Sequence, residues 1–158
     1  MGRINIRQKG AEGEREVIRM LTPIVKEVMT ELQFPAEQVA SAEKIIQRNQ
    51  NQSAVGGGDL SNVFGMSIEV KRQEQLALGA WWAQCLAAAQ RNNEIPVLIW
   101  RQNHKPWRIR TYGFLHTPAQ GGGWSSTQAI VEIDADTFKQ WFKAWVKAQL
   151  MNGYEVKY

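Results

Sequence analysis

The sequence contains a single cysteine, Cys85, and no apolar run close to the roughly 20 residues needed to cross a bilayer. One thiol excludes an intramolecular disulfide, and its alanine-rich surroundings indicate a buried side chain in a reducing compartment. The first residues, MGRINIRQKG, lack the apolar core of a signal peptide. His104 and His116 have no Cys or His partners at zinc-ligand spacing, which argues against a zinc site. We therefore expect an intracellular protein without a membrane partner.

The length and charge of the chain favour a single domain that binds a polyanion. A chain of 158 residues suits one hydrophobic core. The 19 Lys and Arg outnumber the 15 Asp and Glu, and the net charge of +4 suits nucleic acid as a partner. Residues 1–10 carry Arg3, Arg7 and Lys9 with almost no apolar side chains, and we expect a flexible basic arm there. Residues 11–158 then form the single domain.

Hydrophobic periodicity predicts an α/β domain with a small mixed sheet flanked by helices. Thr22-Pro23 either kinks a helix that begins at Ala11 or starts a second one. Trp81 and Trp82 are adjacent in a helical stretch, so we expect unequal burial of the two rings. The expected helices are 11–21, 22–32, 75–91 and 134–151, the expected strands are 44–49, 66–71, 95–101, 107–113 and 129–133, and the glycine-rich loops are 50–58 and 116–126.

The stretch DLSNVFGMSIEVKR (59–72) places charged residues inside a predicted strand. Apolar side chains alternate with polar ones from Met66 to Lys71, so Glu69 and Lys71 project from the same face. A three-residue loop at 63–65 would set Asp59 opposite Glu69 in a hairpin. The alternative is a solvated polar face on a two-stranded edge.

The first helix carries another acid that faces the predicted core. Val17, Ile18 and Leu21 share one stripe of the helix, and Glu14 lies within that stripe. Glu12 and Glu16 are expected on the opposite, solvated face. A glutamate near a helix start can also escape to solvent or favour the helix dipole, so that alternative stays open.

Three converging acids favour a divalent cation, and magnesium suits oxygen ligands. Together with the adjacent cation of Lys71, the pattern of Glu14, Asp59 and Glu69 indicates metal-assisted hydrolysis of a phosphodiester.

Three stretches, KGAEGEREVIRML (9–21), IEVKR (68–72) and IPVLIWRQNHKPWRI (95–109), resemble the archaeal-type Holliday-junction resolvases. These belong to the nucleases of the restriction-endonuclease-like fold, whose motif is Asp, a spacer and Asp/Glu-x-Lys. The resemblance covers Lys9 to Arg110. Residues from Phe114 onward fall outside it, and the glycine-rich loop before Asp59 differs from the family's basic, serine-containing loop.

The resemblance implies a site, a cofactor and a partner. The implied catalytic residues are Glu14, Asp59, Glu69 and Lys71. Asp59, Glu69 and the Val70 carbonyl would hold Mg²⁺, for which Mn²⁺ would substitute, and Glu14 would act as an outer partner or as a ligand of a second ion. The expected DNA-binding residues are Arg3, Arg7, Lys9, Arg15, Arg48, Ser53, Arg72, Arg108 and Arg110.

The resulting hypothesis is a homodimeric endonuclease that resolves four-way DNA junctions by paired nicking. The expected location is the cytoplasm, which includes a phage protein acting in its host. A nuclease for flaps, nicks or DNA ends is an alternative, because the motif determines the chemistry but not the substrate. A DNA-binding module that does not cleave is the other alternative.

Overall fold

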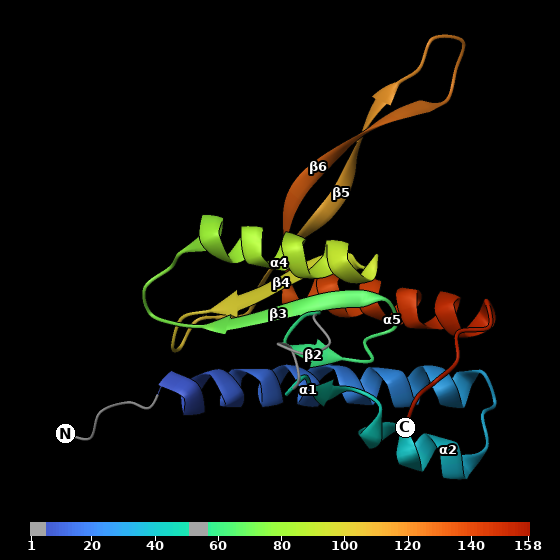
Figure 1. Cartoon of the computed structure of the whole chain (residues 1–158). Coiled ribbons are helices and arrows are strands. Elements are labelled where there is room, and N and C mark those ends of the chain that lie inside the picture. The colour runs from blue at the N-terminus through green and yellow to red at the C-terminus, as the bar shows by residue number, and fades with distance from the viewer. Residues whose placement is uncertain (1–5, 51–56) are drawn as a thin grey trace.

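The computed structural model describes residues 6–50 and 57–158, with side chains from Gln8 onward. A long helix comes first, and a sheet with two further long helices follows (Figure 1). In chain order the elements are α1 (Ile6–Glu31), α2 (Ala36–Ala40), the 3₁₀ turn η1 (Ser41–Lys44), β1 (Gln47–Arg48), β2 (Leu60–Ser61), β3 (Met66–Arg72), α4 (Leu78–Asn92), β4 (Ile95–Arg101), β5 (Arg108–Pro118), β6 (Trp124–Asp134) and α5 (Ala135–Met151).

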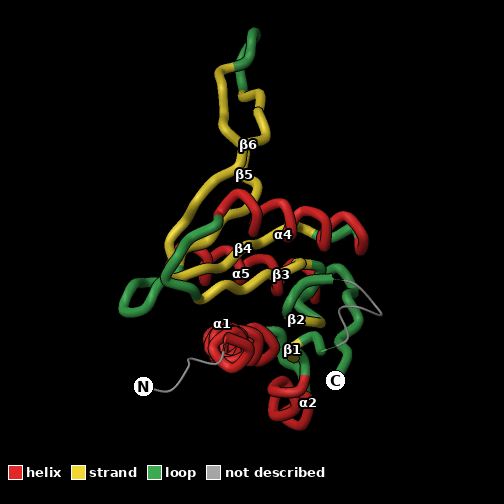
Figure 2. The backbone as a smooth tube through the Cα atoms, turned by 60° about the vertical axis from the view of Figure 1, so that its left-hand side comes forward, coloured by secondary structure: helices red, strands yellow, loops and turns green. Residues whose placement is uncertain are grey.

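The main sheet has four strands in the order β3-β4-β5-β6. β3 and β4 are parallel, with α4 as the connection between them, and the other two pairs are antiparallel. α4 covers one face of this sheet, and α1 and α5 cover the other (Figure 2). β1 and β2 form a separate antiparallel pair beside β3. The predicted α/β class with a mixed sheet between helices is therefore confirmed.

The larger core lies between the sheet and the α1–α5 layer. Val17, Leu21 and Val25 of α1 recur every fourth residue and are fully buried. They pack in one cluster with Phe138 and Phe142 of α5, which are also fully buried. Burial of each such side chain contributes about 1.5–3 kcal/mol, so this cluster holds α1 against the sheet.

The smaller core lies under α4 and contains two neighbouring tryptophans. Trp81 and Trp82 are each 6% exposed, so the expectation of unequal burial was wrong. Both pack with Cys85 against Leu98 and Trp100 of β4. The rings are long enough to reach the sheet from positions about 100° apart on the helix. Cys85 is fully buried, as predicted.

The first helix is longer than the sequence suggested at both ends. α1 begins at Ile6, so residues 6–10, which we assigned to a flexible arm, are helical. It also continues through Pro23 without ending. Proline has no N–H, which removes the hydrogen bond to the Arg19 carbonyl. Pro23 is exposed, so the lost bond falls on the solvent side, where water can replace it.

β5 and β6 are also longer than predicted and project from the body as a hairpin (Figure 1). The glycine-rich insertion supplies the last residues of β5, the first of β6 and the turn between them. Gly121, Gly122 and Gly123 in that turn have φ of 86°, 104° and 76°, a region that favours glycine. Among the described residues, no helix is long and apolar enough to span a membrane.

Candidate active site

The predicted strand around Glu69 is β3, and its edge holds Asp59. The Asp59 N–H donates to the Ile68 carbonyl at 2.8 Å, and the Val70 N–H donates to Asp59 Oδ2 at 2.8 Å. Gly58 makes this approach possible, because a Cβ there would lie 2.4 Å from the Ile68 oxygen. Asp59 is thus fixed beside residues 68–70.

We predicted a hairpin that pairs the strand at Asp59 with β3, and this pairing was wrong. β2 follows Asp59 and pairs with β1 rather than with β3. The chain turns sharply before β3, and Asn62, Phe64 and Gly65 all adopt positive φ. This sharp turn still brings β3 back beside Asp59. Asp59 and Glu69 are therefore neighbours although no strand ladder joins their segments.

Glu69 is a buried acid with an unsatisfied oxygen. Its side chain is 1% exposed, and Oε2 has no hydrogen-bond partner. Burial, followed by the negative charge of Asp59, raises the pKa of Glu69 to about 9. The alternative of a solvated polar face therefore does not apply to this residue.

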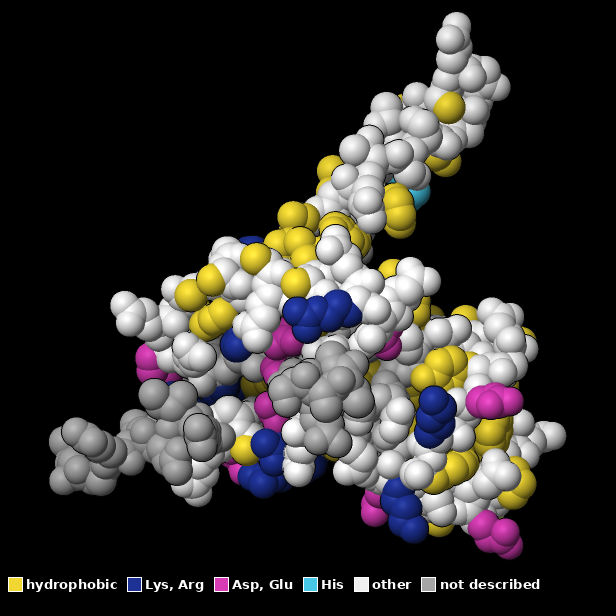
Figure 3. Space-filling view, in the orientation of Figure 1, with side chains coloured by type: hydrophobic (Ala, Val, Ile, Leu, Met, Phe, Trp, Pro, Cys, Tyr) yellow, Lys and Arg dark blue, Asp and Glu magenta, His cyan; other side chains and the backbone are white. Residues whose placement is uncertain are grey.

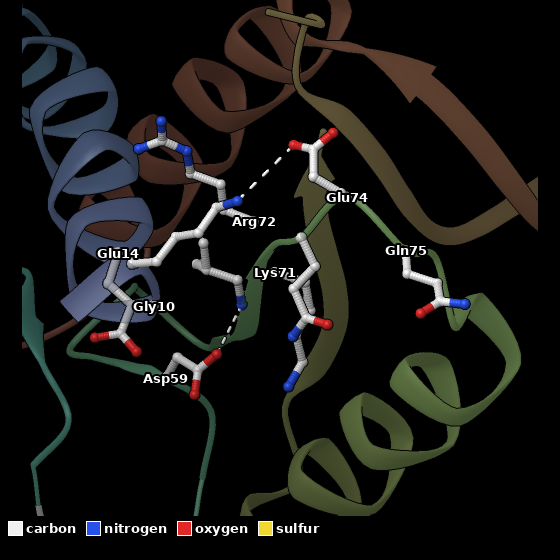
Figure 4. A pocket seen from close by; sticks show the side chains of 10 residues that line it. Gly10, Glu14, Asp59, Lys71, Arg72, Glu74 and Gln75 are labelled. Atoms are coloured by element: carbon white, nitrogen blue, oxygen red, sulfur yellow. Dashed lines mark hydrogen bonds and ion pairs between the residues drawn. The ribbon is translucent and has the colours of Figure 1, made fainter. Parts of the chain in front are cut away.

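Glu14 points from α1 toward the same region, as the helical pattern predicted. Figure 4 shows the carboxylates of Glu14 and Asp59 turned toward the same space. Glu14 Oε2 accepts a hydrogen bond of 2.6 Å from Arg48 Nε, and its side chain is 17% exposed. Burial raises the pKa of Glu14, the hydrogen bond from Arg48 opposes that rise, and the charge of Asp59 adds to it.

A pocket of about 430 Å³ opens between the start of α1 and the end of β3. Val70 and Lys71 line this pocket, whereas their buried strand neighbour Glu69 does not. At the rim, Lys9 Nζ lies 3.8 Å from Glu74 Oε1 (Figure 4). The lining residues are Lys9, Gly10, Glu14, Asp59, Val70, Lys71, Arg72, Gln73, Glu74 and Gln75.

The donor set near this pocket fits a hard divalent cation. The unpartnered Glu69 Oε2, the Asp59 carboxylate and the Val70 carbonyl are all oxygen donors, the type that Mg²⁺ prefers, with water completing its shell. Across residues 6–50 and 57–158, however, no three His, Cys, Asp or Glu side chains gather closely enough to hold one ion. Glu14 is bonded to Arg48, so the structure places two carboxylates, and not three, on β3 and its edge.

The predicted DNA-binding cations divide into exposed and internally paired groups. Arg15 is half exposed and lies near Glu12, and Arg108 is exposed. Arg48 bonds Glu14, as described, and Lys9 lies at the pocket rim. Arg72 bonds Glu16, and Arg110 bonds Glu132. Arg3, Ser53 and the side chain of Arg7 lie outside the described residues.

Glu16 was placed wrongly on the solvated face. It accepts hydrogen bonds from Arg72 Nη1 at 2.6 Å and from Arg101 Nη2 at 2.9 Å, and it ties α1 to the ends of β3 and β4. Arg101 also lies 5.1 Å from the centre of the Trp107 ring. The helix approaches the sheet through Gly13, where an added Cβ would lie 3.2 Å from Arg72 Cβ.

Gly13 lies against β3, and at about 100° per residue Glu14 and Glu16 project to opposite sides of it around the helix. A glycine four residues before Val17 was the available signal for this contact. Glu74 at the pocket rim was also missed, and its sequence position after β3 carries no pattern that would have identified it.

An acid fixed beside a strand that carries Glu-x-Lys, within a mixed sheet flanked by helices, defines a nuclease of the restriction-endonuclease-like class. The chain belongs to the family described as "Phage putative PDDEXK endonuclease", whose model matches residues 5–152. The match supports the resemblance to PD-(D/E)xK nucleases and extends past Arg110, where the sequence resemblance ended. It does not point to the archaeal-type junction resolvases within that superfamily. Comparisons with curated proteins and with solved structures gave no match.

Proposed function

We propose that this nuclease is a metal-dependent, structure-selective DNA endonuclease that cuts four-way junctions by paired nicking as a homodimer. The observation that carries the metal dependence is Glu69, a buried acid with an unpartnered oxygen beside Asp59. A buried carboxylate is costly unless a positive charge compensates it. A cation at this point would remove the cost and supply the chemistry.

Asp59, Glu69 and the Val70 carbonyl would hold the ion, Mg²⁺ with Mn²⁺ as a substitute. A divalent ion bound there would lower the pKa of a water molecule and stabilise negative charge on a phosphate. The hydrogen bond from the Val70 N–H to Oδ2 holds the Asp59 carboxylate in place. Because Glu69 has a raised pKa, it must release a proton before it can act as a ligand.

Lys71 lies in the pocket wall, and its charge acts on Glu69 by lowering the pKa of that acid. An ammonium group at this position would orient the attacking water or stabilise the developing oxyanion. Lys9 at the rim would contact the DNA backbone, and the exposed side chain of Arg15 would extend that contact along α1.

Glu14 is positioned to act on a group in the pocket rather than on the buried acid. Its carboxylate faces the pocket, and Arg48 fixes its orientation through the 2.6 Å hydrogen bond. We assign Glu14 the role of transferring a proton in the reaction, because its pKa is raised above that of an exposed glutamate and so lies closer to neutral pH.

The preference for junctions rests on the similarity of the α1 and β3 motifs to junction resolvases and on the net charge of +4. A two-fold homodimer would place two sites on symmetry-related strands, which paired nicking requires. The location that this implies is the cytoplasm of the cell that holds the DNA.

The test uses end-labelled DNA with the purified full chain and with Asp59→Asn as the inactive control. Four-way junction, nicked duplex, flap, blunt duplex and single strand are incubated with Mg²⁺, with Mn²⁺ or with EDTA. We expect symmetric nicks in the junction, only with a metal ion, and at least about tenfold faster than cuts in the linear duplex. Faster cutting of flaps or ends would replace the junction with that substrate, and equal cutting in EDTA would overturn metal dependence.

A further inference from the structure

The projecting hairpin is a second feature of this molecule that the nuclease site does not explain. β4 pairs with β5 only as far as Thr111, so residues 112–130 of β5 and β6 pair with each other alone. We call this segment the β5–β6 arm. A two-stranded ribbon by itself is marginally stable in water. An arm of this length is therefore expected to gain stability from a surface that covers it.

The arm carries large apolar side chains in the open. Phe114 is 62% exposed, Trp124 71%, Ile130 55% and Leu115 58%. Residues that are directly paired across two antiparallel strands share a face, as do alternate residues along one strand. The register Tyr112↔Ile130, Phe114↔Gln128 and Pro118↔Trp124 therefore puts Tyr112, Phe114, Trp124 and Ile130 on one face, with Leu115 on the other.

The aromatic face of the arm continues the α4 side of the sheet. Tyr112, at its base, packs edge-on against Trp82 with ring centroids 5.7 Å apart. Beyond it, α4 presents Ala80, Ala83 and Ala87 as an exposed row of small side chains. Figure 3 shows apolar side chains along the arm and over α4. A protruding aromatic ridge and a shallow surface of small residues thus lie side by side in one chain.

Both surfaces lack charge. Residues 111–131 contain no Asp, Glu, Lys or Arg, and neither do residues 75–90, although the chain as a whole is 22% charged. DNA binding relies on cations that neutralise phosphates, so these surfaces do not suit a phosphate backbone. A partner for them must itself be apolar and uncharged.

We propose that the arm of one copy lies with its aromatic face against α4 of a second copy, in a two-fold homodimer. A second copy meets the chemical requirement, because each chain offers both the ridge and the surface that receives it. In a two-fold arrangement the contact forms twice. The three exposed side chains of the aromatic face, Phe114, Trp124 and Ile130, alone represent on the order of 400 Å², about half of the ~800 Å² that each partner buries in a standard interface.

This inference specifies the interface of the homodimer in the proposed function, and it is measured without DNA. Sedimentation of the full-length protein over a range of concentrations gives the dimer dissociation constant. We expect the wild type to dimerise and Phe114→Glu to weaken the dimer roughly 100-fold or more, because the carboxylate would be buried in an apolar contact. Ala83→Glu on the receiving surface should have the same effect.

Leu115→Glu is the matched control, since Leu115 is adjacent in sequence and similarly exposed but lies on the other face of the arm. Its dimer should match the wild type within about threefold. Raising the salt concentration should leave the wild-type dimer intact, because the contact contains no charges. Circular dichroism and melting curves check that each variant is folded.

A wild type that stays monomeric would overturn the inference, and so would a dimer that Leu115→Glu weakens as much as Phe114→Glu. A monomeric wild type whose DNA affinity falls in Phe114→Glu would assign the arm to nucleic acid instead. Junction cutting is scored separately. A dimer that cuts no junction supports the interface and refutes the substrate, whereas a monomer that cuts junctions refutes both the interface and the homodimer and leaves the substrate standing.

Discussion

Glu69→Gln should stabilise the metal-free protein, and the gain should grow with pH. Burial and Asp59 raise the pKa of Glu69 from 4.5 to about 9, so the folded state holds a proton that the unfolded state has released. The stability that comes from this proton is fully present below about pH 4.5 and is lost as pH rises toward 9. Glutamine keeps the shape of the side chain and carries no titrating proton.

The magnitude follows from the size of the shift. Each pH unit between the two pKa values of Glu69 costs up to about 1.4 kcal/mol, which gives an upper limit of about 6 kcal/mol by pH 9. Water entry and relaxation around the carboxylate reduce this limit, so we expect a difference of a few kcal/mol between wild type and variant at pH 8.5 and little at pH 5.

Urea unfolding in EDTA between pH 5 and pH 9 measures this difference. Glu12→Gln is the control, because Glu12 is exposed near Arg15 and Arg19 and the pKa of Glu12 is lowered rather than raised. Added Mg²⁺ should stabilise the wild type increasingly as pH rises, because binding displaces the proton, and should have little effect on the variant. Parallel stability curves for wild type and Glu69→Gln from pH 5 to pH 9 would refute the reasoning.

Three further changes test the site and its support. Asp59→Asn should abolish DNA cleavage while DNA binding, measured by fluorescence anisotropy, stays nearly unchanged, because an oxygen donor to the metal is lost but anionic repulsion of phosphate falls; weaker binding with unchanged turnover would contradict this. Glu14→Gln should lower the cleavage rate by at least about 100-fold, whereas Glu12→Gln, two residues earlier on α1 and outside the pocket lining, should cut like the wild type; equal rates would leave Glu14 without a role. Glu16→Gln should cost about 1–3 kcal/mol of unfolding free energy in urea, because Arg72 and Arg101 lose their shared carboxylate; an unchanged midpoint would remove Glu16 from the support of α1.

Local patterns in the sequence predicted correctly where the apolar side chains repeat with the period of a strand, two residues, or of a helix, 3.6 residues. The alternation around Glu69 identified β3, and the helical stripe identified Glu14 as facing the sheet. Glu16 was misplaced because the stripe was centred on its apolar residues, whereas α1 also approaches the sheet at Gly13, a residue that an apolar pattern does not count. Periodicity shows which residues are apolar, but it does not show how closely two backbones approach.

Long-range pairing was the part that the sequence could not reveal. The hairpin from Asp59 to β3 was a prediction from local spacing, yet β2 pairs with β1, more than ten residues earlier in the chain. The length of the β5–β6 arm was missed for a similar reason. Its outer pairs join apolar with polar residues, such as Phe114 with Gln128 and Leu115 with Thr127, so neither strand alternates clearly between apolar and polar positions there.

The bond from the Val70 N–H to Asp59 Oδ2 also affects how the protein behaves at high concentration. β3 is the outermost strand of its sheet, and an edge strand with free N–H groups is a template for pairing with other chains. The carboxylate of Asp59 occupies one such N–H, that of Val70, and so blocks the edge between Glu69 and Lys71. Asparagine at position 59 keeps an oxygen that accepts this bond, whereas alanine leaves the edge open. Two variants with the same loss of catalysis are thus expected to differ in aggregation, and the asparagine form is the better choice for trapping a complex with DNA.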